Sequence, residues 1–428
     1  MDAPASNPWR EAFDAFKASE TAARTGAEAR DAAFARFEAH GVPTKRDEYW
    51  KYTPVRNLLP DAPLAANGVA DVFAGVDAYR LVFVDGHLDG ARSDREALAE
   101  AVDLADAGGE WVARVHGALQ NRAVEGAHRQ VERPFADLNM AMATDGIAIR
   151  VPAGTAPAKP IHLRYEGSAP AHLRLVMLVE EGASATLLES GAGVLTTGAE
   201  IVLEKGATLD HLRAQTEAAD RQFTALYADV GEEARLKSFS LVADAALVRN
   251  ESVVTMKGEN ANGHVAAATM GRGAALLDNT VYVSHEAPHC ESRQVVKNVL
   301  DDEAQAVFQG KIYVQKDAQK TDGYQISQSV LLSEGAAFNA KPELEIYADD
   351  VMCSHGSTTG ALDETALYYL RSRGVPKREA EAMLVSAFLD EAVEEIADEG
   401  LQDVVRAEVA RWMARRSGEA GEGRREAA

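Results

Sequence analysis

The fold is decided by a degenerate repeat that begins at Glu180. Its copies read EEGASATLLES (180–190), EKGATLDHLRA (204–214), GEEARLKSFSLV (231–242) and KGENANGHVAAATM (257–270). Each copy opens with an acidic and glycine-containing turn and continues as a short alternating strand. The turn glycines follow one another at intervals of 24, 25 and 27 residues, at Gly182, Gly206, Gly231 and Gly258. Later stretches keep this form: DDEAQAVFQGKIYV (301–314) and SEGAAFNAKPELEIYA (333–348).

Repeats of this length, made of strands and turns without helical segments, are typical of a β-solenoid. The abundance of Ala in the strands suits a solenoid, because stacked coils leave little room inside. An antiparallel β-sandwich also has short strands and turns at close spacing. The repeats favour the solenoid, and the chain is expected to be mainly β, with a core over residues 137–358.

The region before the core, residues 1–136, is expected to be mixed and largely helical. Apolar residues recur at helical spacing between residues 8 and 40, and Gly41-Val42-Pro43 is a helix-ending signal. A segment from Tyr79 reads as a β-hairpin whose turn is Asp85-Gly86. Helical periodicity returns between residues 95 and 123.

The region after the core, residues 359–416, is expected to be helical. Asp363 is placed to cap a first helix, Gly374 fits the position after its end, and Pro376 fits the first turn of a second helix. The second helix has an apolar stripe at steps of four residues: Ala380, Leu384, Phe388, Ala392 and Ile396. A last helix starts near Leu401, and the tail 417–428 is expected to be disordered.

The composition excludes several classes of protein. Of the 428 residues, 46% are hydrophobic but only 6% are aromatic, and the formal net charge is −23. Such an acidic chain is repelled by nucleic acid and by anionic membranes. Two cysteines, Cys290 and Cys353, are too few for a disulfide framework. The N-terminus lacks a signal-peptide pattern and no long apolar run occurs, so we expect a cytoplasmic protein.

Three common catalytic motifs are missing from the sequence. The Gly310-Lys311 pair lacks the rest of a P-loop, and the glycines of MGRGAALLD (270–278) do not complete a dinucleotide-binding motif. The serine-hydrolase motif G-x-S-x-G is also absent. We therefore expect no bound nucleotide in this chain.

Two groups of histidine and cysteine residues remain as candidates for chemistry. In the first, His285 and His289 are four residues apart beside Cys290, but Pro288 forbids the helix that would make them a zincin-like pair. Loop histidines in solvent beside a buried cysteine are the favoured interpretation.

The second group is Cys353 and His355, on a segment that reads as a strand. Residues two apart on a strand share a face and lie roughly 6.6 Å apart along the chain. Both side chains can just converge on one metal ion, which needs sulfur at ~2.3 Å and nitrogen at ~2.0–2.1 Å. Two ligands undersupply a metal, so further donors would come from elsewhere. Spacing alone leaves ordinary packing open as the alternative.

Several long stretches resemble the SufB/SufD family of iron–sulfur cluster assembly proteins. They are His285–Pro376, which contains CSHGSTTG, then DEYWKYTPVRNL from Asp47 and LNMAMATDGIAIRVP from Leu138. The resemblance implies a right-handed parallel β-helix with an N-terminal α/β region and a C-terminal helical region. The low cysteine count and the lack of a CxxC motif make the chain similar to the SufD branch.

The resemblance also implies a function. Members of the SufD branch are non-catalytic scaffold subunits that pair with SufB through their β-helices, and nascent iron–sulfur clusters are built at that interface. The family motif CSHGAT falls on residues 353–358, with Ser357 in place of alanine. His355 is the first candidate for a cluster ligand shared with SufB, and Cys353 is the second.

A third implied property is an ATPase partner, SufC, which docks on the C-terminal helices and drives a conformational change. Candidate contacts are Leu367, Leu370, Arg371, Arg373 and Phe388, with the two leucines also expected to pack against the end of the solenoid. A homodimer is possible when the chain is isolated.

Two alternative functions stay open. The chain can be a purely structural partner of SufB that ligates no cluster. It can also be a β-helix enzyme acting on polysaccharide, with carboxylates along a groove: Glu343, Glu345, Asp349 and Asp350. The scarcity of aromatic residues, which stack on sugars, argues against the enzyme.

Overall fold

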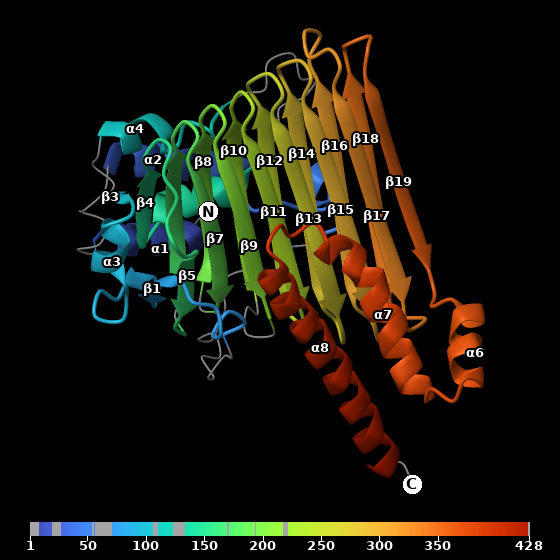
Figure 1. Cartoon of the computed structure of the whole chain (residues 1–428). Coiled ribbons are helices and arrows are strands. Elements are labelled where there is room, and N and C mark those ends of the chain that lie inside the picture. Colours follow the sequence, from blue (N-terminus) through green and yellow to red (C-terminus); the bar gives the residue numbers. More distant parts are fainter. Residues whose placement is uncertain are drawn as a thin grey trace, which may run out of the picture.

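The structure, a computed structural model, describes residues 8–18, 27–53, 55, 71–105, 110–122, 133–168, 171–192, 194–216 and 221–426. Its centre is a stack of parallel strands that form two sheets (Figure 1). The chain alternates between the sheets, so that each coil adds one strand to each, with seven full coils from β6 to β19.

The first sheet has ten strands and ends at the last strand of the chain. In spatial order these are β19 (Met352–Gly360), β17 (Asp322–Leu331), β15 (Glu291–Leu300), β13 (Asn262–Gly271), β11 (Arg235–Ala243), β9 (Thr208–Gln215), β7 (Ser184–Gly191), β5 (Ile161–Glu166), β1 (Tyr79–Val84) and β2 (His87–Leu88). All neighbours are parallel except the β1–β2 hairpin.

The second sheet has nine strands. They are β18 (Ala337–Ile346), β16 (Gln305–Val314), β14 (Leu276–His285), β12 (Leu247–Met256), β10 (Arg221–Val230), β8 (Val194–Leu203), β6 (Ala171–Val179), β4 (Asp145–Val151) and β3 (Asp103–Ala105). Only β3–β4 is antiparallel. The predicted solenoid is therefore confirmed, and the sandwich is excluded because its strands would pair antiparallel. The predicted hairpin is also confirmed, and its first strand, β1, joins the stack by pairing with β5.

The turns of successive coils stack through a ladder of residues with left-handed backbone. Each turn residue donates its N–H to a carbonyl of the next turn, as from Gly182 to Lys205 at 2.9 Å. The equivalent positions, all with positive φ, are Gly154, Gly182, Gly206, Glu233, Asn260, His289 and Lys320. Gly231 and Gly258 are therefore not equivalent to Gly206, and the coils lengthen from 24 residues (Gly182–Gly206) to 31 (His289–Lys320). Gly231 and Gly258 serve close approach instead, because a Cβ at either would collide with the backbone of the preceding turn.

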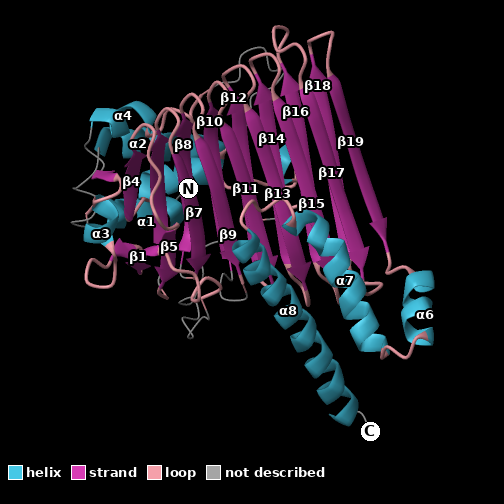
Figure 2. Cartoon of the chain, in the orientation of Figure 1, coloured by secondary structure: helices cyan, strands magenta, loops and turns pink. Residues whose placement is uncertain are grey.

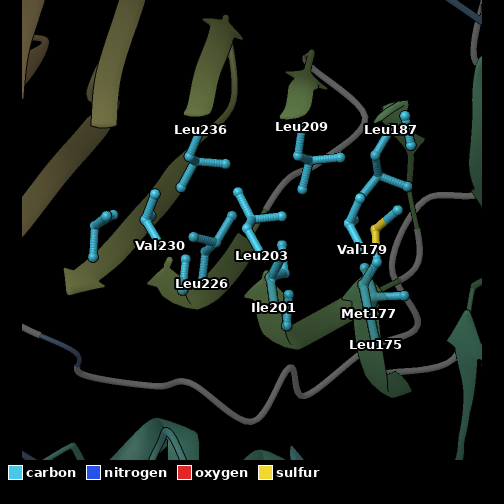
Figure 3. Packing of buried hydrophobic residues seen from close by; sticks show 14 of the residues in the cluster. Leu175, Met177, Val179, Leu187, Ile201, Leu203, Leu209, Leu226, Val230 and Leu236 are labelled. Carbon is cyan, nitrogen blue, oxygen red and sulfur yellow. The ribbon is translucent and has the colours of Figure 1, made fainter. Parts of the chain in front are cut away.

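Apolar side chains from both sheets meet inside the solenoid (Figure 3). Leu203, Leu226 and Val230 of the nine-stranded sheet face Leu209 and Leu236 of the ten-stranded sheet. Alternate residues point inward because strands have a period of two. The small and branched residues of the repeat thus form the closely packed interior that the sequence predicts.

The N-terminal region covers the outer face of the nine-stranded sheet (Figure 2). Its helices are α1 (Pro8–Lys17), α2 (Ala27–His40), the 3-10 turn η2 (Glu48–Trp50), α3 (Arg95–Ala99), α4 (Glu110–Val115) and α5 (Pro134–Met142). Phe135 of α5 stacks on Phe223 of β10, with ring centres 4.7 Å apart, and Trp50 packs beside both. Helix α2 ends before Gly41 as predicted.

The C-terminal helices are α6 (Glu364–Ser372), α7 (Lys377–Val393) and α8 (Glu399–Glu426), and α7 and α8 cover the outer face of the ten-stranded sheet (Figure 1). The predicted cap is present, since Asp363 accepts from the N–H groups of Thr365 and Ala366. Gly374 has the left-handed backbone expected after α6.

The predicted apolar stripe of α7 is wrong in its middle. The buried residues are Ala380, Val385, Leu389, Ala392, Val393 and Ile396. Leu384 and Phe388 are only half-buried. Because a helix has 3.6 residues per turn, a row drawn at steps of four drifts away from the buried face. The true stripe mixes steps of three and four.

Helix α8 continues to Glu426, so the structure differs from the disordered tail expected from residue 417. Residues 417–426 contain three glutamates and two arginines, which favour a helix, and three glycines, which do not. The extension therefore depends on the helix that packing has already nucleated upstream. Within the described part of the chain, no helix combines the length and apolarity that a bilayer crossing requires.

Candidate functional site

Cys353 and His355 lie on β19, the terminal strand of the ten-stranded sheet. Cys353 pairs with Gly323 and His355 with Gln325 on β17. The strand has β17 on one side, while its other edge is the end of the sheet (Figure 2). The donors are therefore on the last coil of the solenoid.

Both side chains belong to the inner face of the strand, at the open end of the stack. The Cys353 sulfur is 3.2 Å from the position that a Cβ on Gly323 would occupy, and Ile312 of the interior lies beside the same glycine. The inner face continues at Ser357, whose hydroxyl accepts from Ser327 at 3.3 Å. His355, two residues after Cys353, shares this face.

Cys353 packs as a small apolar residue. It is half-buried and contacts a cluster that includes Ile312, Val314 and Ala348. Burial raises the pKa of the Cys353 thiol, partly offset by a backbone hydrogen bond from Gly323. The thiol is therefore protonated at neutral pH in the isolated chain, and it becomes a metal ligand only after losing that proton.

His355 is exposed to solvent. Across the described ranges, no group of three or more His, Cys, Asp or Glu side chains is arranged to hold a metal ion. This chain thus offers an accessible imidazole with one thiol two residues away.

The two edge strands of the last coil differ in their side chains. Strand β18 carries Pro342 and the charged residues Lys341, Glu343 and Glu345, which discourage a further strand from pairing there. Strand β19 reads MCSHGSTTG and has neither proline nor a formal charge. Exposed apolar side chains lie on this coil as well: Ile346, Tyr347 and Met352, the last 70% exposed.

The first histidine group is arranged differently from its prediction. His289 is exposed in a turn, as expected, but His285 ends strand β14 and is fully buried, with its Nε2 2.9 Å from the Ser292 hydroxyl. Burial lowers the pKa of His285 to about 4. Cys290 is buried and its thiol lies 3.2 Å from the Gly258 carbonyl. The prediction of a solvated His285 was wrong because this residue is the last of strand β14, on the face that Val281 and Val283 turn to the interior, and does not belong to the loop that contains Pro288.

The predicted ATPase contacts lie on α6 and α7. Helix α6 has no buried residue; Leu367 and Leu370 are half-buried, whereas Arg371 and Arg373 are exposed. Helix α6 contacts α7. Phe388 is half-buried against the cluster between α7 and the sheet, with the Lys297 ammonium 4.9 Å from its ring centre.

Three of the carboxylates considered for a sugar-binding groove are paired with lysines. Glu343 contacts Lys341 at 3.2 Å, Glu345 pairs with Lys311, and Asp350 pairs with Lys320. These ion pairs occupy the carboxylates that a hydrolase would need as acid and nucleophile.

Comparison with known proteins agrees with this architecture. The family model described as "SUF system FeS cluster assembly, SufBD core domain" matches residues 163–388. The iron–sulfur cluster assembly protein SufD of Escherichia coli is 32% identical over 86% of this chain and 89% of its own length. An iron–sulfur cluster assembly SufBD family protein of Synechocystis is 31% identical over 85% of this chain and 86% of its own.

The chain belongs to the SufBD family, in its SufD branch.

The SufBD core match covers both the last coil and most of α7, so the candidate cluster site and the candidate ATPase contacts fall in the shared part of the family. The resemblance to iron–sulfur cluster assembly proteins is thereby confirmed, and the polysaccharide enzyme is set aside. The sequence analysis did not single out Gln325, which pairs with His355 on the neighbouring strand. A glutamine on a predicted strand is not distinctive until the fold shows that it is buried.

Proposed function

We propose that this chain is a non-catalytic scaffold subunit for iron–sulfur cluster assembly that pairs with a SufB-type sister chain at its last coil. The observation that carries the proposal is the position of His355, exposed on the inner face of the uncharged terminal strand β19. A cluster is the cargo of such a site, and the two chains together supply its ligands.

The edge chemistry selects the surface for pairing. An incoming strand needs free backbone groups and no opposing charge, which β19 offers and β18 does not. Covering this coil would also bury Ile346 and Met352, which are exposed in the isolated chain. The sister chain would bring its own donors next to His355.

His355 would supply a neutral imidazole nitrogen to iron, while thiolates of the sister chain supply most of the ligand charge. Replacing one thiolate by imidazole leaves the cluster less negative and its bond to the protein more labile. Such a bond suits a site that must release its cargo. Cys353 is the second candidate donor, and its raised thiol pKa means that metal binding would displace a proton.

The C-terminal helices are the proposed docking surface for a SufC-type ATPase, which binds the nucleotide. Helix α6 projects from the end of the sheet and exposes Tyr368, Tyr369, Arg371 and Arg373 (Figure 1). Aromatic and arginine side chains are enriched where proteins bind each other. The half-buried Leu367, Leu370 and Phe388 would hold α6 and α7 in place as the ATPase moves them.

Movement of α7 would reach the sheet through Lys297, which is almost fully buried and bonds both Glu391 of α7 and Gln328 of β17. Gln328 pairs with Thr358 on β19, the strand that carries His355. Displacing α7 would thereby bias the last coil and open the shared site.

The test is cluster build-up in the assembled complex. The chain is co-purified with SufB and SufC partners, reconstituted anaerobically with iron and sulfide, and followed by visible absorption. His355→Ala is expected to abolish the cluster absorption while the complex still assembles. His289→Ala, which removes another exposed histidine, is the matched control and should behave like the wild type.

Two outcomes would redirect the proposal. Normal cluster build-up in His355→Ala would leave the chain as a purely structural partner of SufB. Failure to bind either partner would remove the scaffold function itself.

A further inference from the structure

Two buried glutamines lie directly behind His355. Gln294 on β15, Gln325 on β17 and His355 on β19 occupy the same position in successive coils. Both glutamines are completely buried. Neither the oxygen nor the nitrogen of either side-chain amide has a hydrogen-bond partner among the described residues.

This arrangement costs stability. A buried amide without a partner is destabilising, and Phe308 and Ile312, which flank Gly310 on the opposite strand, are apolar and cannot bond it. Upstream in the same column the structure has Val265, so the coil accepts an apolar side chain at this position. The glutamines begin only where the solenoid approaches its open end.

The opposite strand makes room for the amide of Gln325. A Cβ at Gly310 of β16 would collide with the Gln325 amide nitrogen and with the Phe308 ring. Glycine is therefore required at position 310 for this amide to enter the interior. Packing alone would be better served by a larger residue at 310 and a leucine at 325.

We propose that Gln325 is a positioning residue for His355. The structure has no direct hydrogen bond between them, so its amide reaches the ring nitrogen of His355 that faces into the solenoid through one water or after a change of rotamer, and leaves the outer nitrogen free for a metal. Adjacent strands are only about 4.8 Å apart, which places the two side chains within this reach. An amide can donate or accept, so it fixes one tautomer of the imidazole.

The inference rests on the proposed function in one respect, namely that the positioned imidazole is a cluster ligand. Histidines that bind metals almost always hydrogen-bond through their other nitrogen, and loss of that partner costs about 10–100-fold in metal affinity. Gln325 is the residue next to His355 in its column, and its amide has no other described partner.

The test measures His355 without any metal. The isolated chain is labelled with ¹⁵N-histidine, and the tautomer of His355 is read from long-range ¹H–¹⁵N spectra, assigned with His355→Gln. In Gln325→Leu, the tautomer ratio is expected to shift toward that of free histidine. Gln325→Glu keeps an acceptor for the ring N–H, so it should keep one tautomer dominant.

Gln294→Leu is the matched control, one coil deeper in the same column. It should leave the His355 spectrum unchanged. Gln325→Met provides a second apolar replacement of similar length. An unchanged tautomer ratio in both apolar Gln325 variants, or an equal change in Gln294→Leu, would overturn the proposal.

Cluster loading in the complex separates this inference from the proposed function. If Gln325→Leu alters the His355 spectrum and weakens cluster retention by 10–100-fold, both stand. If it alters the spectrum while His355→Ala builds clusters normally, Gln325 positions a histidine that is not a ligand, and only the proposed function fails.

Discussion

The first and last coils of the solenoid are closed in different ways. At the first end, helix α3 and the residues after it cover the interior. Leu98 of α3 and Val102 are buried in the interior cluster with Leu81 and Phe83 of β1. At the last end, the interior cluster consists of residues from β16 to β19 and their turns, and the described helices α6–α8 add none to it. A solenoid needs a cap at both ends. The described residues of this chain cap the first coil but not the last.

The polar groups inside the two halves differ in the same way. In the earlier coils, Glu189 accepts hydrogen bonds from Tyr165, His211 and Arg213 at 2.7–2.8 Å. Burial alone would raise the pKa of Glu189, but the Arg213 charge and the hydrogen bonds from His211 and Tyr165 outweigh it and lower the pKa. In the later coils, the amides of Gln294 and Gln325 have no such partners. Satisfied polar groups hold a fold together, whereas amides without partners fit the positioning role proposed above for Gln325.

The largest effect is expected from replacing an isoleucine in the earlier coils, compared with the same replacement in the last coil. Ile201 on β8 and Ile346 on β18 both face inward, but Ile201 is buried and Ile346 is 37% exposed. Ile201→Ala should lower the free energy of unfolding by about 2–5 kcal/mol. Ile346→Ala should cost about 1 kcal/mol or less, because much of its surface stays in water. Urea denaturation followed by circular dichroism measures both; equal losses would show that the last coil is as well packed as the others.

A smaller effect is expected from acid, through buried histidines in both halves. Burial lowers the pKa of His172 on β6 and of His285 on β14 from 6.5 to about 4. The unfolded chain therefore binds protons below pH 6.5 that the folded chain refuses, and stability falls as the pH decreases from 6.5 to 4. At pH 5 the loss from each histidine is about 2 kcal/mol.

The measurement is the free energy of unfolding at pH 7 and pH 5. His285→Gln should lose about 2 kcal/mol less than the wild type between these two values, and His172→Gln should behave alike. If His285→Gln keeps the full pH dependence of the wild type, the later coils are open to water at that position.

The smallest effect concerns the outer cover. Removing Glu391 leaves the buried Lys297 ammonium with Gln328 as its remaining side-chain partner. Glu391→Ala should cost about 1–2 kcal/mol, less than for a fully buried pair because Glu391 itself is largely exposed. Glu394→Ala, at the exposed residue that directly follows α7, should change stability by at most about 0.5 kcal/mol. The double variant Lys297→Met/Glu391→Ala should recover the stability lost in Glu391→Ala, because no buried charge is then left unpaired. If Glu391→Ala and Glu394→Ala lower the free energy of unfolding equally, the contact of Lys297 with α7 does not stabilise the fold.

Much of the fold could be predicted from local chemistry. The turn-and-strand repeat predicted the solenoid, Asp85-Gly86 the hairpin and Asp363 the start of α6, because each depends on residues close in sequence. The phase of the repeat was wrong because Glu233, Asn260 and His289 adopt the left-handed backbone that glycine usually marks. The glycines that caught attention serve close approach instead.

The candidate site could be predicted only in part. The spacing of Cys353 and His355 placed them on one face of a strand, but spacing does not say whether that strand is central or terminal. The burial of His285 and the column from Gln294 to His355 depend on which strands become neighbours in space. Pairing of residues about 30 positions apart follows from coil length, which varies along this chain.

The central claim is that a ring nitrogen of His355 binds the cluster, and the most direct test is to detect that nitrogen as a ligand. The complex is assembled with ¹⁵N-histidine only in this chain, its cluster is reduced, and pulsed electron paramagnetic resonance is recorded. We predict a strong coupling from one directly bound ¹⁵N nucleus that is lost in His355→Ala and kept in His289→Ala. A reduced cluster without such a coupling, or with one that persists in His355→Ala, would contradict the shared site at the open end of the solenoid.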